Sequence, residues 1–257
     1  MSLIVSEAMG DGVWRIAINR PEVRNAISPD TRLELIDAFS GALANSAVTA
    51  ILMGSTGGHF SSGGDIRTMG KGDARDARAR MKLHHRFVRM VAESEKPVVA
   101  AVEGYAMGAG AGLVLFADTI VVAESGAIGF PFFKVGLTPD FAIPYSLTRR
   151  VGWARARQLI FYARTVRGKA AVEMGLADEL APDGQAEARA FELAKELAAM
   201  PPMAFSLTKH HLLKEPRSLD AALEAEATAQ PLCSTGPEHT EGRAAFRESR
   251  KPDFRKA

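Results

Sequence analysis

The stretch from Lys96 to Asp118, KPVVAAVEGYAMGAGAGLVLFAD, decides how the rest of the chain is expected to fold. Val98 to Val102 is a short apolar run rich in β-branched residues, which is typical of a strand covered on both faces. Ala111 to Ala117 carries no charge, so a helix there is expected to be buried on all sides. The glycines between the two segments let another group approach the backbone closely. The stretch therefore predicts a buried strand, a glycine-rich turn and a buried helix.

The turn also predicts a place for an oxygen that gains negative charge. A helix that starts near Gly108 leaves its first backbone N–H groups without partners inside the helix. Those donors, and the positive end of the helix dipole, favour an oxyanion. The alternative is that the glycines only allow a helix to pack tightly on a sheet. No Lys-Ser or Lys-Thr pair follows the glycines, and no suitably placed acidic residue accompanies them, so neither a P-loop nor a dinucleotide fingerprint is predicted.

The composition is that of an ordinary globular protein. The chain has 257 residues, of which 47% are apolar and 24% are charged, and its formal charge is +2. This charge argues against a dedicated nucleic-acid surface. The single cysteine, Cys233, excludes an intrachain disulfide and a cysteine-rich zinc site, and it fits a reducing compartment. Because we find no signal-peptide pattern and no long apolar segment, we expect a cytoplasmic protein that does not interact with membranes.

Hydrophobic periodicity predicts an α/β body over residues 1–200 and a helical region over residues 201–257. Residues 71–80 are dense in charge and are expected to form a mobile surface segment or an exposed helix start. Residues 126–144 are expected to form a loop. Strands are expected at residues 3–9, 13–19, 50–54, 98–102 and 119–123, and helices after Ser28 and at residues 81–91, 154–163, 169–174, 185–199, 203–214, 219–230 and 238–250.

Four motifs follow one another along the chain, and their order is characteristic: RPEVRNAIS, HFSSGGDI, KPVVAAVEGYAMGAGAG and IGFPFFKVGLTPD. Together with the tail AFRESRKPDF, this series resembles the crotonase (enoyl-CoA hydratase/isomerase) superfamily over essentially the whole chain. The resemblance implies a spiral of ββα units followed by a C-terminal helical trimerisation region, and a homotrimer or hexamer. It also implies an acyl-CoA thioester as substrate and no cofactor besides the coenzyme A of that substrate.

The resemblance further implies the residues of the site. The backbone N–H groups of Gly64 and Ala109 should form an oxyanion hole, in which each donor contributes about 3 kcal/mol to transition-state stabilisation. Asp65 could equally be a turn-forming carboxylate, and Arg24 could be a surface cation. Contacts with the substrate or coenzyme A are implied for Arg24, Ala26, Ser62, Asp65, Ile66, Gly108, Pro131 and Phe132, and, in its own or a neighbouring subunit's site, for Phe246 and Lys251.

The sequence departs from the hydratase pattern of the family at two positions. Hydratases carry two glutamates that hold and activate water, and this chain has Gly112 and Phe132 in their places. Asp140 lies where family isomerases carry an acid facing the substrate α-carbon, and the phenylalanines around it disfavour the ionised carboxylate, as suits a general base. The alternative is that Asp140 caps the helix that follows Pro139.

Three hypotheses about function follow from the resemblance. The favoured one is a Δ3,Δ2-enoyl-CoA isomerase with Asp140 as proton shuttle. The segment IPYSLTRRVG also resembles an aryl-CoA dehalogenase, which implies Asp140 as nucleophile and His85 as base, although His85 could be an ordinary helix residue. The third is a catalytically silent protein that binds coenzyme A or RNA, and the near-neutral charge argues against RNA. No metal site is predicted, because His59, His210 and His211 lack suitably spaced partners.

Overall fold

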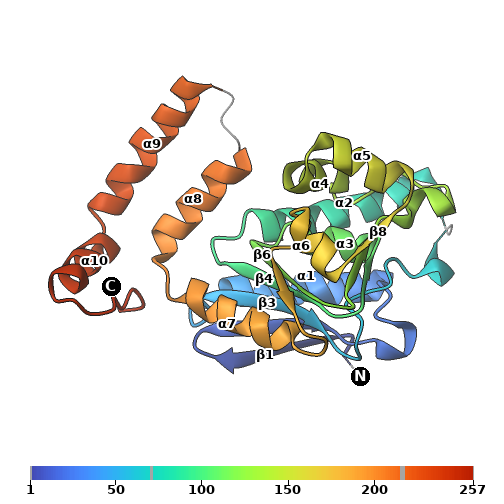
Figure 1. Ribbon diagram of the computed structural model, residues 1–257, viewed down its shortest axis with the longest axis horizontal. Coiled ribbons are helices and arrows are strands. Elements are labelled where there is room, and N and C mark those ends of the chain that lie inside the picture. The colour runs from blue at the N-terminus through green and yellow to red at the C-terminus, as the bar shows by residue number, and fades with distance from the viewer. Residues whose placement is uncertain (1, 70–71, 215–217, 257) are drawn as a thin grey trace.

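The computed structural model describes residues 2–69, 72–214 and 218–256 (Figure 1). Within these ranges the chain forms a sheet of six strands in the order β1-β2-β3-β4-β6-β9. β1 and β2, at the first two predicted strands, pair as an antiparallel hairpin, and every other neighbouring pair is parallel. The strands are β1 Ile4–Gly10, β2 Val13–Ile18, β3 Ala50–Ser55, β4 Val98–Val102, β6 Thr119–Ala123 and β9 Glu179–Ala181.

A second sheet within the described residues consists of three short strands, β5 Tyr105–Met107, β7 Ala127–Gly129 and β8 Thr165–Arg167, in the order β5-β7-β8. The chain therefore passes from the large sheet into the small one between β4 and α3. The prediction of a loop over residues 126–144 is wrong at β7 and at the 3-10 helix Pro131–Val135. Strands of three residues are too short to show a period-two pattern, so the sequence did not reveal them.

The helices of the body follow the predicted pattern closely. α1 begins after Ser28, whose hydroxyl accepts a hydrogen bond from the Thr31 N–H. Lys71 lies outside the described residues, and the rest of the charged segment forms the start of α2, whose N-cap Asp73 accepts from the N–H groups of the first turn. The helix-start alternative is therefore confirmed. The body helices are α1 Pro29–Ala44, α2 Ala74–Ala92, α3 Ala109–Val114, α4 Ile143–Val151, α5 Trp153–Phe161, α6 Gly168–Glu173 and α7 Ala186–Ala198, with 3-10 helices at Pro21–Val23 and Ile66–Thr68.

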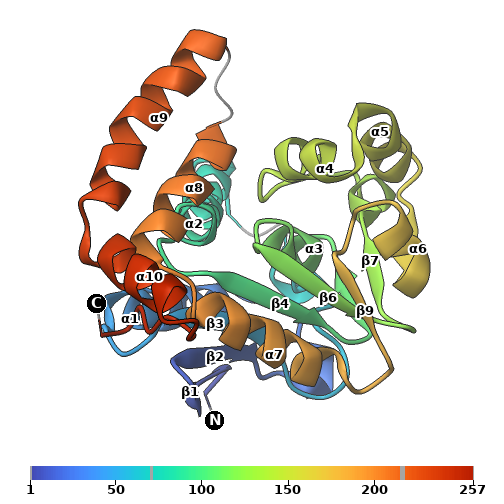
Figure 2. The same cartoon turned by 60° about the vertical axis from the view of Figure 1, so that its left-hand side comes forward.

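Apolar side chains cover both faces of the large sheet. α7 packs on one face through Ala186, Ala190, Ala194 and Ala198, whose regular spacing and small size let the helix lie close to the strands (Figure 2). α1, α2 and α3 contribute to the larger core on the other face. In that core the rings of Phe39 and Phe87 pack edge to face with their centroids 5.1 Å apart. The all-alanine face explains why α7 could be predicted from sequence.

The C-terminal helices α8 Pro202–Lys214, α9 Leu219–Ser234 and α10 Pro237–Arg247 extend from one side of the body, as Figures 1 and 2 show. The three helices predicted for this region are confirmed. α8 is attached to the body by a buried ion pair between Lys209 Nζ and Asp118 Oδ2, 2.8 Å apart. Among the described residues of α9, none is buried. No described helix is both long and apolar enough to cross a membrane.

Candidate active site

Two backbone segments lie side by side at the start of α3. Met107 N–H donates to the Ser61 carbonyl over 2.9 Å, and Ser61 forms a parallel bridge with Ala106. A Cβ on Gly63 would lie 2.8 Å from the Met107 carbonyl oxygen, so this close approach requires glycine, as does its φ of +98°. Within the described part of the chain, the N–H groups of Gly64 and Ala109 have no hydrogen-bond acceptor. The fold thus leaves two free donors on adjacent segments; their pairing as an oxyanion hole stays a prediction.

Gly108 connects the small sheet to α3 in a backbone conformation, φ +51° and ψ −113°, that favours glycine. Its N–H donates to the Gly129 carbonyl over 2.9 Å. The ring of Phe132 lies next to it, because a Cβ on Gly108 would be 3.8 Å from Phe132 Cζ. The structure therefore brings Gly108, Ala109 and Phe132 together, and Pro131 begins the 3-10 helix that carries Phe132.

The Asp140 carboxylate faces α2 and does not cap α4. α4 begins at Ile143 after Ala142, and no side chain caps it. Only the backbone carbonyl of Asp140 accepts from the Ile143 N–H, over 3.0 Å. Phe141 and Ala142, with φ of +50° and +51°, separate the carboxylate from the helix start. The capping hypothesis is therefore wrong.

His84 lies against this carboxylate, with its Nδ1 3.3 Å from Asp140 Oδ2. The His84 residue is 4% exposed, and its ring stacks on Phe141 with the centroids 4.3 Å apart. Burial lowers the pKa of His84, and the neighbouring Asp140 opposes this effect. The Asp140 side chain is 24% exposed, and its Oδ1 is buried without a hydrogen-bond partner among the described residues.

The histidine beside Asp140 is thus His84, whereas the dehalogenase hypothesis named His85. His85 is exposed on the outer side of α2. One residue along a helix turns a side chain by about 100°, so neighbours cannot share a face. His84 precedes the buried Phe87 by three residues and Val91 by seven, which is the spacing of the buried face. This spacing was the signal that could have identified it.

Phe141 occupies the space beside Gly112, where a hydratase of the family would carry its first glutamate. A Cβ on Gly112 would overlap the Cβ of Phe141 and lie 2.9 Å from its Cγ. Phe132, at the position of the second glutamate, is almost completely buried. The structure therefore has no room for a glutamate side chain at position 112. The packing is consistent with a sequence that lacks the two glutamates of a hydratase.

Five of the residues implied to contact the substrate or coenzyme A lie at or near the start of the 3-10 helix Ile66–Thr68, namely Arg24, Ala26, Ser62, Asp65 and Ile66. The Ser62 N–H donates to the Arg24 carbonyl over 2.9 Å, and Asp65 N–H donates to the Ile27 carbonyl over 3.0 Å. Arg24, Ser62 and Ile66 are exposed, whereas Ala26 is buried. The binding role of this edge of the molecule stays a prediction.

The carboxylate of Asp65 is engaged within the loop. It accepts from Arg67 Nη2 over 2.8 Å and Arg67 Nε over 2.9 Å, and it also lies near Arg20. The hydrogen bond from Arg67 is the main reason why the pKa of Asp65 falls to about 2. These are the interactions of a turn-forming carboxylate, so a contact between this side chain and coenzyme A stays a prediction.

Phe246 and Lys251 belong to the C-terminal extension. Phe246 is 87% exposed. In both views of the fold, α10 lies on the opposite side of the molecule from α4 and α5 (Figures 1 and 2). α10, which carries Phe246, is therefore far from α4 within this chain, and a contact of Phe246 or Lys251 with a coenzyme A in its own or a neighbouring subunit stays a prediction.

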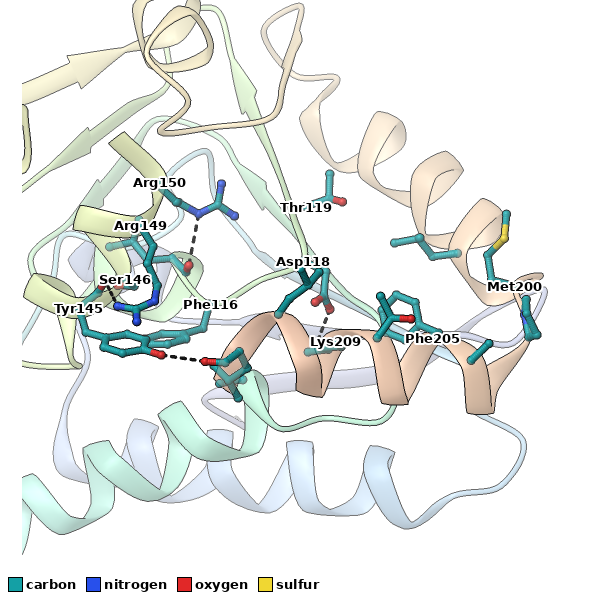
Figure 3. A pocket seen from close by; sticks show the side chains of 18 residues that line it. Phe116, Asp118, Thr119, Tyr145, Ser146, Arg149, Arg150, Met200, Phe205 and Lys209 are labelled. Carbon is teal, nitrogen blue, oxygen red and sulfur yellow. Dashed lines mark hydrogen bonds and ion pairs between the residues drawn. The ribbon is translucent and has the colours of Figure 1, made fainter. Parts of the chain in front are cut away.

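A cavity of about 610 Å³ lies between α8 and the body (Figure 3). Apolar side chains of α8 and of the segment just after α3, among them Phe205, Leu212 and Phe116, form much of its wall. α4 contributes mainly polar side chains, of which Tyr145 Oη donates to the Leu213 carbonyl over 3.0 Å. Burial raises the pKa of Asp118 and lowers that of Lys209, while each charge opposes the shift of the other. None of the predicted catalytic or oxyanion-hole residues is in its lining. Among the described residues no group of three or more His, Cys, Asp or Glu is placed to hold a metal ion.

Free backbone N–H donors and a partly buried carboxylate are groups that enzymes use to stabilise an oxyanion and to transfer a proton. The profile of the enoyl-CoA hydratase/isomerase family matches residues 8–257. The chain therefore belongs to this family of enzymes, the crotonase superfamily, as its motifs indicate.

Named relatives and solved structures agree with this assignment. The crotonyl-CoA hydratase of Syntrophomonas wolfei subsp. wolfei is 32% identical over 239 residues, which is 92% of each chain. The crystal structure of an enoyl-CoA hydratase from Bacillus anthracis matches with a TM-score of 0.93 at 25% identity, over 100% of both chains. That of an enoyl-CoA hydratase from Polaromonas sp. JS666 matches with a TM-score of 0.91 at 28% identity, over 97% of this chain and 98% of the other. These matches confirm the predicted fold class.

Proposed function

We propose that the protein is an acyl-CoA isomerase that moves a double bond from C3 to C2 of an enoyl-CoA thioester, with Asp140 as the proton shuttle. The observation that carries the proposal is the carboxylate of Asp140, which is partly buried and has one oxygen without a partner in the described structure. A general base needs such a free oxygen within reach of the substrate.

The proposed reaction uses groups that the chain itself provides. The thioester oxygen accepts hydrogen bonds from the N–H groups of Gly64 and Ala109, which stabilise the negative charge that develops on it. Asp140 removes a proton from C2, and the electron pair forms a dienolate across the thioester and the double bond. The protonated carboxyl then returns the proton to C4, so the double bond ends between C2 and C3 and the carboxylate is regenerated.

His84 supports this reaction by holding one side of the carboxylate. Its lowered pKa favours the neutral ring at neutral pH, so it does not form a permanent ion pair that would weaken the base. The contact with Oδ2 leaves Oδ1 for the substrate. Contacts of this length often shorten when a substrate binds.

The two missing acids support an isomerase over a hydratase, although the named relatives are hydratases. Addition of water requires groups that hold and activate a water molecule. Gly112 has no side chain to do so, and its surroundings are filled by Phe141. Phe132 offers only an apolar ring. A single carboxylate is sufficient for the isomerase reaction, because the same proton leaves C2 and arrives at C4.

The contact between His84 and Asp140 also favours a second candidate, hydrolytic dehalogenation of an aryl-CoA. In that reaction Asp140 attacks the ring carbon and forms an aryl ester, the halide leaves, and His84 activates a water molecule that hydrolyses the ester at the Asp140 carbonyl. His84 takes the place that the sequence had suggested for His85.

The test is incubation with 3-hexenoyl-CoA, crotonyl-CoA and 4-chlorobenzoyl-CoA, with the products identified by mass and NMR. We expect conversion of 3-hexenoyl-CoA to 2-hexenoyl-CoA and negligible formation of 3-hydroxybutyryl-CoA. Release of chloride from the aryl thioester would favour the second candidate. Binding of coenzyme A without turnover of any of them, beside a positive RNA gel shift, would instead indicate a binding protein.

A further inference from the structure

Three side chains near the proposed base share an unusual property. Across the residues that the structure describes, five buried side-chain nitrogen and oxygen atoms have no hydrogen-bond partner, and all five belong to Arg32, His84 and Asp140. Buried polar groups are almost always hydrogen-bonded, and exceptions tend to mark places where a ligand completes the arrangement. His84 contacts Asp140, and the charge of Arg32 acts on both, so the three side chains belong to one region of the molecule.

Arg32 is the member of this cluster that the proposed reaction does not use. It lies in the first turns of α1, three residues before the buried Leu35 and four before Ile36. Its Nε and Nη1 are buried without a partner, and it forms no ion pair among the described residues. Arg32 as a whole is half-buried, and two guanidinium nitrogens without a partner are costly to bury, so α1 would ordinarily carry an apolar residue at this position.

The charge of Arg32 acts on both of the other side chains. Burial lowers the pKa of Arg32, and the negative charge of Asp140 opposes this effect while the charge of Arg80 adds to it. Arg32 also contributes to the lowered pKa of His84. The charges of the guanidinium and of the proposed base therefore interact. However, the carboxylate of Asp140 forms no ion pair with Arg32 in the described structure.

A second carboxylate would satisfy this arrangement. A guanidinium presents its N–H groups in a planar fork that matches the two oxygens of a carboxylate. The chain offers no such partner for Arg32 in its described residues, and the charge of the acid that the reaction requires acts on this guanidinium. The missing partner is thus expected on the molecule that occupies the site.

We propose that Arg32 binds a carboxylate on the acyl group, so that the substrates are ω-carboxyacyl-CoA thioesters. This inference rests on the proposed function only in placing the acyl group beside Asp140. His84, whose Nδ1 contacts the catalytic Asp140, has one N–H donor as a neutral ring and can donate to only one acid at a time.

Binding tests the inference separately from the reaction. The probes are adipoyl-CoA and hexanoyl-CoA, which are saturated and differ in the terminal carboxylate. We expect the wild-type protein to bind adipoyl-CoA about 10- to 100-fold more tightly than hexanoyl-CoA in calorimetry, the scale of a hydrogen-bonded charge pair. Arg32→Met should remove this preference and leave the affinity for hexanoyl-CoA nearly unchanged.

Matched variants separate a binding role from a structural one. Arg86→Met removes an exposed arginine from α2 and should keep the preference. In the absence of ligand, Arg32→Met should melt no lower than the wild type, because an unpaired buried charge is replaced by an apolar side chain of similar length. Equal affinity of the wild type for the two thioesters, or a preference that persists in Arg32→Met, would overturn the proposal.

Turnover then distinguishes the two proposals from each other. 3-Hexenedioyl-CoA and 3-hexenoyl-CoA repeat the comparison with reactive substrates. If the protein prefers adipoyl-CoA in binding but isomerises neither 3-hexenedioyl-CoA nor 3-hexenoyl-CoA, the role of Arg32 is supported and the isomerase proposal is overturned. Isomerisation of both 3-enoyl substrates at equal kcat/KM, with no preference for adipoyl-CoA in binding, would support the isomerase and overturn the role of Arg32.

Discussion

Phe141 packs directly against the backbone of Gly112, so that a Cβ on this glycine would lie 2.9 Å from the Phe141 Cγ. Phe141 also stacks on His84, so the same ring excludes a side chain at position 112 and covers the histidine beside Asp140. The aromatic residue that follows the proposed base thus takes the space of an acid that hydratases of the family require.

This packing predicts the effect of adding a single methyl group. Gly112→Ala forces the Cβ against a fully buried ring, and we expect it to lower the free energy of unfolding by about 1–3 kcal/mol. Gly41→Ala is the matched control, because Gly41 lies within α1 and a Cβ there meets no atom within 4 Å. That variant should be stabilised by about 0.5–1 kcal/mol, as usual for glycine in a helix. Urea unfolding of both proteins is the measurement, and equal stabilities would contradict the packing described here.

Asp65 predicts a stability change at acid pH. Its folded pKa of about 2 lies below the ordinary value of 3.8, so the unfolded chain takes up the proton first. The stability contributed by this ionised carboxylate is complete above pH 3.8 and is lost as the pH falls toward 2. Asp65→Asn should flatten the stability profile in this window, as thermal melts can show. Asp37→Asn, at an exposed position of α1, should leave the profile unchanged.

His84 predicts a second pH-dependent change in stability, nearer neutral pH, which arises because a neutral histidine is buried. Its pKa is lowered in the folded protein from 6.5, so the unfolded chain binds a proton more readily as the pH falls below 6.5. The groups that act on it are Asp140, Arg32 and His85, of which only Asp140 favours the charged ring. The wild type should therefore lose stability as the pH falls below 6.5, and His84→Gln should lose less. The exposed His85→Gln is the control, and an identical slope in all three proteins would contradict the burial of a neutral His84.

How much the sequence could predict depended on the length of each pattern. The β-branched run at β4 and the alanines of α7 repeat often enough to be recognised, and the ordered motifs identified the family. The strands β5, β7 and β8 contain three residues each and depend on contacts between distant segments. The resemblance identified Asp140 as the proposed base. To choose His84 over His85 as its neighbour, one had to know which face of α2 is buried. Arg32 was missed because the helical pattern of α1 was used only to find buried apolar residues. Its spacing from Leu35 and Ile36 places Arg32 on the same side of the helix.

The C-terminal helices predict self-association. Leu219 and Leu223 lie one helical turn apart on α9 and are largely exposed, as is Phe246 on α10. Apolar rows of this kind usually mark a protein interface, so we expect a trimer or hexamer by light scattering at micromolar concentration. Leu223→Arg should shift the mass toward the monomer, and Lys82→Glu on α2 should not. A monomeric wild-type mass would reject the predicted trimerisation role of residues 201–257.

The decisive variant for the proposed reaction is Asp140→Asn. The amide keeps the size of the side chain but cannot accept the C2 proton, so kcat on a 3-enoyl-CoA should fall at least ~10²-fold, the usual scale for loss of a general base. The fold should be retained, because this side chain does not cap α4, its Oδ1 has no hydrogen-bond partner within the described residues, and the amide can keep the contact with His84. A melting temperature close to that of the wild type, together with unchanged affinity for coenzyme A, would confirm that the loss is chemical. Full activity in a folded Asp140→Asn protein would exclude Asp140 as the proton shuttle, and it would exclude the nucleophile of the second candidate as well.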